Sequence, residues 1–557
     1  MSSSPTHIAL EPGSDAFPLL TPAQIDRLRP YGQVRKVKAG EVLFEPGDSN
    51  VPVYVLLSGG VDIVQTCPQS ERMLVSHVPG SFTGEFSLIS GQRALLRGRV
   101  TQDGEFLLIP AGDLRSIVAK DVELGEIFMR AYILRRLVLI QEGAGNVIIL
   151  GSHHCANTLR LRDFLGRNGY PYKYIDLDHD ERSQSILDHF EVKIHEVPVV
   201  VCNGRNVLRN PSIRDVADCL GLNTNIDVSQ VRDLIVVGAG PSGLAAAVYA
   251  ASEGLDVLVV ETATPGGQAG SSSRIENYLG FPTGISGNEL AGRALAQAQK
   301  FGADIMVACS AVRLDCDRRP YQVILDQGPP LAARSIVLAA GAQYNKPPLP
   351  KLGSFEGQGV YYGATHMEAQ LCEGEDVIVV GGGNSAGQAA VFLSQKARKV
   401  HMLVRSGKLA DTMSRYLIWR IEANPKIELH YHTEVTQVDG NAHLERVTWR
   451  DRDTGQTAPH NIRHLFIMTG ASPRTEWLEG CLALDGKGFV LTGYDLDKPT
   501  LEAKAWPLPR PPLILETSLP GVFAVGDIRS GNVKRVASAV GEGSIAIHLV
   551  HRALAEL

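Results

Sequence analysis

The sequence predicts a multidomain α/β protein, and three observations predict this fold class. With 557 residues, the chain is too long for one hydrophobic core, because single cores stop growing at roughly 250–300 residues. Two segments, residues 233–261 and 376–406, share one order of strand, glycine turn, alanine-rich helix and strand. Residues 33–110 consist instead of short apolar strands separated by glycines. We therefore expect parallel α/β domains preceded by a β-rich domain.

The composition is that of a globular protein without a surface for nucleic acid. Hydrophobic residues make up 44% of the chain and charged residues 20%, and the net charge of -6 is spread along it. Each domain can therefore bury a core, and no basic patch favours nucleic acid. The N-terminus lacks the features of a signal peptide, and no run of about 18 apolar residues could span a membrane. We expect a cytoplasmic location.

The eight cysteines are scattered singly along the chain. No two of them have the Cys-x-x-Cys spacing, which argues against a zinc site and against a local redox dithiol. We therefore expect no metal site.

The near-repeat consists of two βαβ units, at residues 233–261 and 376–406. In the first unit, Gly238, Gly240 and Gly243 follow an apolar strand and open a helix. Backbone N–H groups and the helix dipole can then face a pyrophosphate without a side chain in the way.

An acidic residue about 20 positions after such a turn bonds the ribose hydroxyls, and Glu261 stands there. The alternative is a tight strand-to-helix turn that binds no ligand.

The second unit carries Gly381, Gly383 and Ala386, the G-x-G-x-x-A variant of the motif. Arg405 replaces the acidic residue, and Lys408 follows it. A carboxylate would repel the 2′-phosphate of NADPH, whereas Arg and Lys can pair with it, so the first site suits FAD and the second suits NADPH. If the two basic residues are only solvated, NADH is the alternative.

The N-terminal half divides into two further blocks. Residues 33–110 predict a small β-barrel or jelly roll, and residues 121–142 carry apolar positions at helical spacing. Residues 145–222 predict a strand, a helix ended by Gly169, a second strand, and a hairpin that turns at Asn203-Gly204. The polar stretch 223–232 is expected to be a linker.

From residue 232 to its end the chain resembles the low-molecular-weight thioredoxin reductases, the class II pyridine nucleotide-disulfide oxidoreductases. The motifs that carry the resemblance are VVGAGPSGLAAAVYAA, PGGQ (265–268), IENYLGFPTGISGNEL (275–290), VLAAGA (337–342), VIVVGGGNSA, FIMTGASPRT (466–475) and LPGVFAVGDIR (519–529). The resemblance implies two Rossmann-like domains, FAD and NADPH as cofactors, NAD(P)H-dependent oxidoreductase activity and a homodimer.

The resemblance also assigns residues around the flavin. Gln268 and Asn277 would lie near the flavin ring, and Gly526 and Asp527 would hold the ribityl and phosphate part of FAD. A helix opening at Lys534, with Arg535, Val536 and Ala537, would aim its positive end at the flavin's pyrimidine edge, where a helix N-terminus stabilises the anionic reduced flavin.

By the same resemblance the FAD domain comprises residues 232–350 and 485–557, with the NAD(P)H domain inserted as residues 351–484. We expect residues 494–513, which contain five prolines, to form a surface excursion without a catalytic role.

The family's dithiol, Cys-Ala-Thr-Cys, is replaced in this sequence by Gly363-Ala364-Thr365-His366. Neither glycine nor histidine forms a disulfide, and Cys372 has no partner nearby in sequence. The family's dithiol relay therefore cannot operate. His366 is either a catalytic proton donor or acceptor beside the flavin or a polar filler of the vacated position.

The first block, residues 1–142 with the trailing helix, contains KAGEVLFEPGD, YVLLSGGVDIV and FTGEFSLISGQRALLRGRV in this order. On these motifs it resembles a cyclic-nucleotide-binding domain from residue 30 on. In that family a Gly-Glu pair holds the ribose and an Arg holds the cyclic phosphate, and Gly84, Glu85 and Arg93 match them. Leu95-Leu96 stand where a small or hydroxyl residue is usual, so nucleotide binding stays open.

The second block, residues 145–222, resembles a glutaredoxin or thioredoxin-like domain. Cys155 occupies the place of that family's Cys-x-x-Cys, at a helix N-terminus that would lower a thiol pKa. Val197-Pro198 matches its cis-proline turn. Cys155 is either a catalytic monothiol or an incidental residue of a docking module.

The sequence thus favours a cytoplasmic flavoprotein that moves a hydride from NAD(P)H to FAD and on to an unidentified acceptor. The acceptor is left open among a partner's disulfide, Cys155, a quinone-like molecule and oxygen. Two alternatives remain: a disulfide reductase that relays electrons through Cys155, and a non-catalytic redox or cyclic-nucleotide sensor.

Overall fold

The computed structural model describes most of the chain. The residues outside the described part are 1–10, 68–69, 85–92, 142–146, 153–154, 179–195, 203–205, 225, 273–274, 276–277, 357, 365, 411, 442 and 557. The predicted ligand residues Glu85 and Asn277 therefore lie outside the described residues. None of the described helices is long and apolar enough to cross a membrane.

The N-terminal block is a pair of four-stranded antiparallel sheets, as the alternation of apolar residues predicts. One sheet has the order β1-β8-β3-β6 and the other β2-β7-β4-β5. The strands are β1 Gln33–Val37, β2 Val42–Phe44, β3 Val53–Leu56, β4 Gly60–Cys67, β5 Ser70–His77, β6 Phe82–Thr83, β7 Arg97–Gln102 and β8 Gly104–Ile109. Among the described residues, the helices that flank the sheets are α1 Pro22–Leu28, α3 Ala111–Lys120 and α4 Val122–Gln141. The helix predicted over 121–142 is confirmed by α4.

The second block is a mixed four-stranded sheet with the order β10-β9-β11-β12. Its elements are β9 Val147–Gly151, α5 Ala156–Arg167, β10 Lys173–Asp176, β11 Val199–Cys202, β12 Asn206–Arg209 and α7 Ile213–Leu220. The pairing of β11 with β12 confirms the predicted hairpin, whose turn residues lie outside the described part. The peptide bond Val197-Pro198 is cis.

The first βαβ unit, residues 233–261, is part of a larger domain, the first dinucleotide unit. This domain contains a seven-stranded sheet whose parallel part has the order β15-β14-β13-β18-β29. The strands are β13 Arg232–Val237, β14 Val257–Val260, β15 Asp304–Met306, β16 Ala311–Asp315, β17 Tyr321–Leu325, β18 Leu331–Leu338 and β29 Val522–Ala524. The helices are α8 Pro241–Ser252, α9 Gly267–Gly270, α10 Gly287–Phe301 and α15 Val536–Glu556. Since β29 and α15 come from the C-terminal segment, the chain leaves this sheet and returns to it.

The second dinucleotide unit forms a five-stranded parallel sheet, β20-β27-β21-β22-β23, beside a three-stranded antiparallel sheet, β24-β25-β26. The strands are β20 Val360–Tyr361, β21 Asp376–Val380, β22 Lys399–Leu403, β23 Ile427–His430, β24 Thr433–Gly440, β25 Leu444–Asp451, β26 Thr457–His460 and β27 His464–Ile467. The helices are α11 His366–Leu371, α12 Asn384–Leu393 and α13 Arg415–Glu422. Both predicted βαβ units are thus confirmed.

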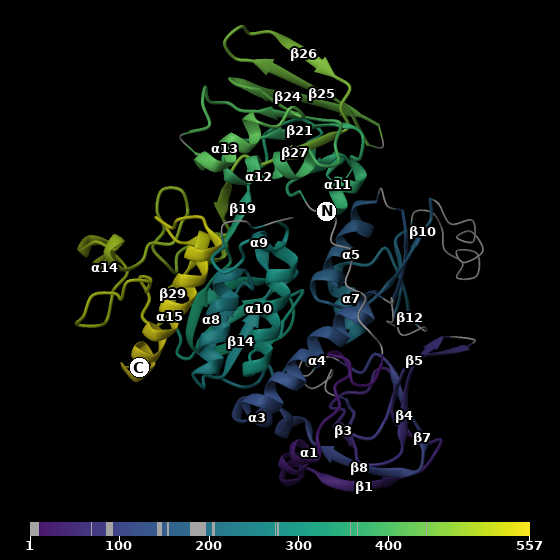
Figure 1. Cartoon of the computed structure of the whole chain (residues 1–557). Coiled ribbons are helices and arrows are strands. Elements are labelled where there is room, and N and C mark those ends of the chain that lie inside the picture. The colour runs from purple at the N-terminus through teal and green to yellow at the C-terminus, as the bar shows by residue number, and fades with distance from the viewer. Residues whose placement is uncertain are drawn as a thin grey trace.

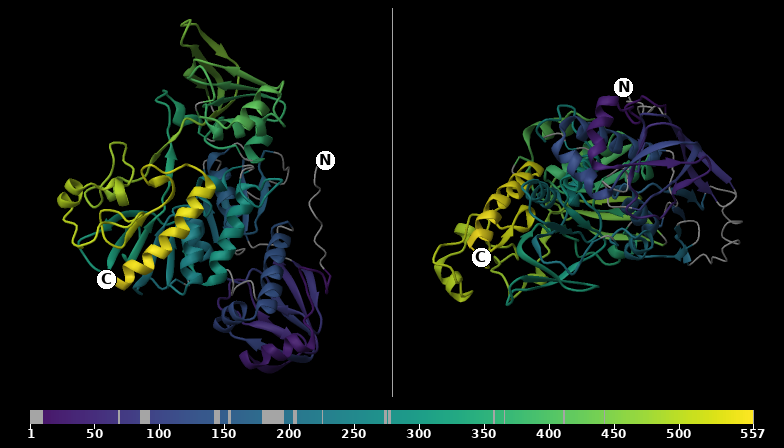
Figure 2. Two further views of the ribbon diagram at one scale, coloured as in Figure 1. Left: turned by 60° about the vertical axis from the view of Figure 1, so that its left-hand side comes forward. Right: turned by 90° about the horizontal axis from the view of Figure 1, so that it is seen from below.

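Two short strands join the dinucleotide units. β19 Ala342–Tyr344 leads out of the first unit and β28 Ala471–Pro473 leads back, and the two pair antiparallel. Figures 1 and 2 show the second unit (green) and the N-terminal sheets (purple) at opposite ends of the molecule, with the first unit (teal and yellow) between them.

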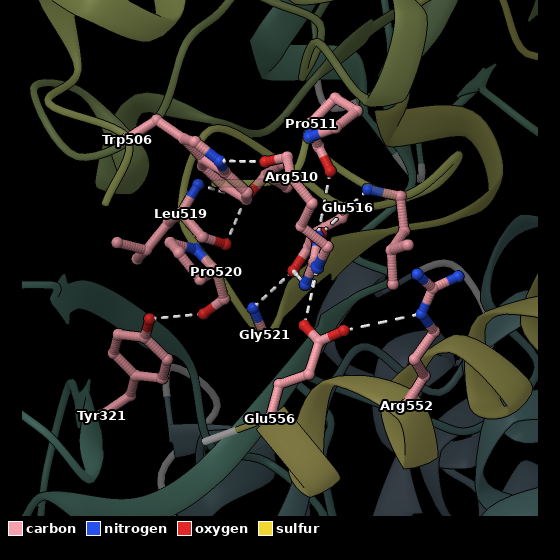
Figure 3. Close-up of polar contacts among 12 residues, drawn as sticks. Tyr321, Trp506, Arg510, Pro511, Glu516, Leu519, Pro520, Gly521, Arg552 and Glu556 are labelled. Atoms are coloured by element: carbon pink, nitrogen blue, oxygen red, sulfur yellow. Dashed lines mark hydrogen bonds and ion pairs between the residues drawn. The ribbon is translucent and has the colours of Figure 1, made fainter. Parts of the chain in front are cut away.

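The proline-rich segment 494–513 is a surface excursion, as predicted, and contains the short helix α14 Lys498–Ala503. Its end is fixed to the body of the protein by Arg510, which pairs with the fully buried Glu516 and with Glu556 of α15 (Figure 3). The excursion is thus tied to the C-terminal helix.

Candidate functional site

The first glycine turn needs each of its three glycines for a different reason. A Cβ on Gly238 would lie 2.4 Å from the carbonyl oxygen of Ala339, and one on Gly243 would lie 1.9 Å from that of Gly238. Gly240, the N-cap of α8, faces open space, with the nearest atom 4.0 Å from its Cβ position. The outer two glycines allow tight packing, and Gly240 leaves room for a phosphate at the helix N-terminus.

Glu261 follows β14 and supports the loops around this turn. Its Oε2 accepts a hydrogen bond from the Ala239 N–H at 2.8 Å, and its Oε1 accepts one from the Ala263 N–H at 2.9 Å. Burial raises the pKa of this carboxyl, and both N–H groups and Arg167 act in the opposite direction. Each carboxylate oxygen keeps a lone pair for a further donor, as a ribose hydroxyl would require.

The second glycine turn is built in the same way. Gly381 has φ +145°, and a Cβ there would lie 2.4 Å from the carbonyl oxygen of Met468. Gly383 is the N-cap of α12 and is open, with its nearest neighbour 3.9 Å from the Cβ position. The Thr412 hydroxyl donates to the carbonyl oxygen of Gly382 at 2.8 Å and holds the turn. This helix N-terminus also suits a phosphate.

One cavity of about 1420 Å³ joins the two turns. Ten of the predicted cofactor residues line it: Gly238, Gly240, Glu261, Gln268, Gly381, Gly383, Arg405, Asp527, Arg535 and Val536. The predicted residues that the structure does not bring to its wall are Gly243, Ala386, Lys408, Gly526 and Ala537. Some of these pack behind the wall: a Cβ on Gly526, for example, would lie 2.5 Å from Ser242 Oγ.

The helix α15 begins at Val536, two residues after the start at Lys534 that the family resemblance implies, and its first residues face the cavity. Asp527 lines the same wall, and burial raises its pKa while the nearby Lys534 acts against that shift. The N-terminal end of α15 therefore presents positive potential to the cavity.

Gly363, which by the family resemblance takes the place of the first cysteine of a dithiol, lies against this site. The Cβ position of Gly363 is 3.8 Å from Cβ and Oγ of Ser271, whose hydroxyl donates to the carbonyl oxygen of Gln268 at 2.8 Å. Ser271 and Gln268 both line the cavity. His366 is the first residue of α11, but its side chain lies outside the described part of the structure. Gly363 thus stands beside the wall where the flavin is expected.

Arg167 is a site residue that the sequence analysis missed. It ends α5 of the second block, yet its guanidinium lines the cavity and donates to the carbonyl oxygens of Pro265 at 3.1 Å and Gly267 at 3.0 Å. Cys155, the partly buried N-cap of α5, stands at the other end of this helix. Twelve helical residues span about 18 Å at a rise of 1.5 Å each, so the structure does not bring Cys155 to the cavity wall.

The N-terminal sheets enclose a separate cavity of about 90 Å³. Gly84 lines it, together with mostly apolar side chains and the buried Arg135 and His77. Arg93 is not among its described lining residues: it is exposed and lies against Gly221 of the second block. The proposed Gly84 and Arg93 pair is therefore not assembled around this cavity.

Comparison with known proteins agrees with this architecture. The family model for pyridine nucleotide-disulphide oxidoreductases matches residues 232–543, and that for the cyclic nucleotide-binding domain matches residues 34–121. The thioredoxin reductase of Streptomyces clavuligerus is 34% identical over 331 residues, which cover 59% of this chain and 96% of that protein.

Solved structures give the same result. The crystal structure of Lactococcus lactis thioredoxin reductase in its FR conformation has a TM-score of 0.52 at 25% identity, and covers 58% of this chain and 100% of that one. The thioredoxin reductase of T. acidophilum has a TM-score of 0.51 at 27% identity, with 58% and 98% covered. The chain therefore belongs to the pyridine nucleotide-disulphide oxidoreductase family, as a thioredoxin reductase-like oxidoreductase that uses FAD and NADPH and carries an N-terminal cyclic nucleotide-binding domain.

Proposed function

We propose that this enzyme passes electrons from NADPH through FAD to an acceptor outside its own dinucleotide domains, without an internal dithiol at the flavin. The observation that carries the proposal is the single cavity lined by both glycine turns. When bound, NADPH supplies a hydride and FAD accepts it. The protein's part is to hold the two groups in one enclosed space.

The residues around the cavity divide that task. The N-termini of α8 and α12, at Gly240 and Gly383, suit the two pyrophosphates. Glu261 suits the ribose of FAD, and Arg405 suits the 2′-phosphate of NADPH. The first turn of α15, at Arg535 to Ala537, would stabilise negative charge on the reduced flavin.

Arg405 gives a direct test of the NADPH preference. The Arg405→Ala enzyme is expected to show a KM for NADPH raised about tenfold, since a charge-assisted hydrogen bond contributes about 1.5–3 kcal/mol, and an unchanged KM for NADH. Steady-state kinetics with both nucleotides measure this. Arg446→Ala is the matched control, because Arg446 is exposed on β25 of the same domain and does not line the cavity. Equal effects of Arg405→Ala on both nucleotides would contradict the assignment.

The family's two cysteines are missing at residues 363–366, and this limits which molecules could accept the electrons. Because Gly363 stands where the family has the first cysteine, reduced flavin has no neighbouring disulfide there to reduce. An external disulfide, a quinone-like molecule and oxygen are the candidate acceptors. A thioredoxin-type disulfide is the first one to try, since the relatives are named thioredoxin reductases. The proposed role of His366 is proton transfer beside the flavin.

The defining experiment is anaerobic. The purified holoenzyme is mixed with NADPH or NADH, flavin bleaching is followed, and candidate acceptors are then added with and without cyclic nucleotides. Bleaching by NADPH and reoxidation by one acceptor are expected. Failure of both nucleotides to bleach the flavin would overturn the proposal and favour the alternative of a redox or cyclic-nucleotide sensor.

A second candidate function is disulfide reduction relayed through Cys155, and the contact of α5 with the flavin-side loop is the observation in its favour. The position of Cys155 at the far end of α5 speaks against it. We expect Cys155→Ser to keep the wild-type rate with every acceptor, including a disulfide, in the same anaerobic assay. Loss of disulfide reduction with normal flavin bleaching would instead establish the relay.

The N-terminal blocks are proposed to regulate this chemistry. The first block would respond to a cyclic nucleotide at the cavity that Gly84 lines, and the second would be a thioredoxin-like docking module. By the family resemblance we also propose a homodimer.

A further inference from the structure

Two histidines and a glutamate gather on neighbouring strands of the second dinucleotide unit. In the parallel register, His401 of β22 lies opposite Glu428 of β23, and Leu403 lies opposite His430. Residues two apart on a strand point to the same face, so Glu428 and His430 share a face. Their side chains and that of His401 meet there, with 43%, 21% and 13% of the side-chain surface exposed, respectively. The cluster is half buried yet open to solvent.

The donor atoms have the spacing of a ligand set. His401 Nδ1 lies 3.1 Å from His430 Nε2, which is 3.6 Å from Glu428 Oε1, and Glu428 Oε2 is 3.9 Å from His401 Nδ1. Ligands bound at about 2.0–2.2 Å around a tetrahedral ion are separated by roughly 3.3–3.6 Å. A small rotation of the carboxylate would bring all three donors to one ion.

The donor types select the class of ion. Two imidazoles and one carboxylate suit zinc and related first-row transition metals, whereas calcium and magnesium prefer oxygen donors throughout. We propose that His401, Glu428 and His430 bind one divalent transition-metal ion, with Zn²⁺ as its representative. Three protein ligands leave the fourth position to water.

The surroundings fit such an ion. The ring of Trp449 from β25 lies 5.6 Å from the His401 ring and 5.4 Å from the His430 ring, centroid to centroid, and walls one side of the cluster. Lys399 pairs with Glu428 Oε2, which leaves Oε1 directed to His430. Both imidazoles must carry their proton on the outer nitrogen, so that Nδ1 of His401 and Nε2 of His430 offer lone pairs to the ion.

The ion would link β22 and β23 next to the loop that carries Arg405. The carbonyl oxygen of His430 accepts the N–H of Val404 at 2.9 Å, directly before Arg405. Metal binding would therefore stabilise the edge of the sheet from which Arg405 projects, without taking part in electron transfer.

Equilibrium dialysis tests the site. The holoenzyme, stripped with a chelator, is dialysed against Zn²⁺, and bound zinc is measured per chain for the wild type, the double variant His401→Gln/His430→Gln, and the control His443→Gln. His443 is an exposed histidine of the same domain. We expect the wild type and control to bind one zinc more per chain than the double variant, and zinc to raise the Tm of these two proteins only. Equal zinc content in all three would overturn the proposal.

A more conservative variant distinguishes the loss of metal binding from a loss of the fold. Glu428→Gln keeps the shape of the side chain and removes its charge, and the bound FAD and NADPH-dependent bleaching report that the fold is intact. We expect its zinc affinity to fall at least tenfold with FAD content unchanged. An affinity equal to that of the wild type in this folded variant would contradict the assignment of Glu428.

Discussion

The Gly243→Ala variant is expected to lose its FAD. The added Cβ would lie 1.9 Å from the carbonyl oxygen of Gly238. The oxygen cannot move away without a shift of the turn, and the Cβ cannot move without a shift of α8. Because the turn and the helix N-terminus together form the proposed phosphate site, this shift is expected to remove the donors that would hold the cofactor. The measurement is the ratio of flavin to protein after purification, which we expect to fall to less than about a tenth of the wild-type value, with activity falling in parallel.

A glycine on another helix provides the control for this change. Gly292 lies in α10 on the surface, and a Cβ there would meet nothing within 4 Å. Gly292→Ala should keep a full complement of FAD and gain up to about 1 kcal/mol of stability, because alanine favours a helix over glycine. If Gly243→Ala retained FAD as Gly292→Ala does, the first turn would not be the cofactor site.

Removing Glu516 is expected to have the largest effect on stability. This carboxylate is fully buried and accepts four hydrogen bonds, from Nη1 and Nη2 of Arg510 at 2.7 and 3.3 Å, from the Leu513 N–H at 2.8 Å and from the Gly521 N–H at 2.9 Å (Figure 3). Glu516→Ala removes the buried carboxylate partner of Arg510, which keeps its pair with Glu556, and leaves the N–H groups of Leu513 and Gly521 without this acceptor. Breaking a buried ion pair in this way costs about 3–5 kcal/mol.

The loss of Glu516 can be followed by two measurements. Thermal unfolding should show a lower Tm, and limited proteolysis should cut the excursion 494–513 faster, because Arg510 would lose one of its two carboxylate partners. Glu502→Ala is the control. The Glu502 side chain is 69% exposed, and its Oε1 lies 3.8 Å from Nζ of Lys498, which is long for an ion pair. Such surface pairs contribute about 0–1 kcal/mol. Equal Tm values for the two variants would show that Glu516 does not anchor the C-terminal segment.

The two βαβ units could be predicted from sequence because their chemistry is local. Gly238 and Gly381 need backbone conformations and close approaches that glycine allows, and the apolar strands before them are typical of a buried parallel sheet. The start of α15 was predictable from the family motif. Each βαβ unit is contained in about 30 consecutive residues, so a single stretch of sequence carries the signal for it.

The contacts between distant segments left no such signal. Arg167 reaches carbonyl oxygens 98 and 100 residues further along the chain, and one arginine at a helix end is common in any sequence. His401 and His430 are 29 residues apart and meet only because β22 and β23 pair in one register. The same reason explains Arg93, which matches a motif locally but lies against Gly221 once the second block has packed onto the first.

The proposed function requires that no dithiol shares electrons with the flavin. An anaerobic reductive titration of the holoenzyme tests it most directly, because a flavin takes up two electrons and a neighbouring disulfide would take up two more. We predict that one equivalent of NADPH or dithionite per FAD completes the reduction, before and after alkylation of the accessible thiols. Uptake of four electrons per FAD would show that a second redox centre exists and would contradict this account.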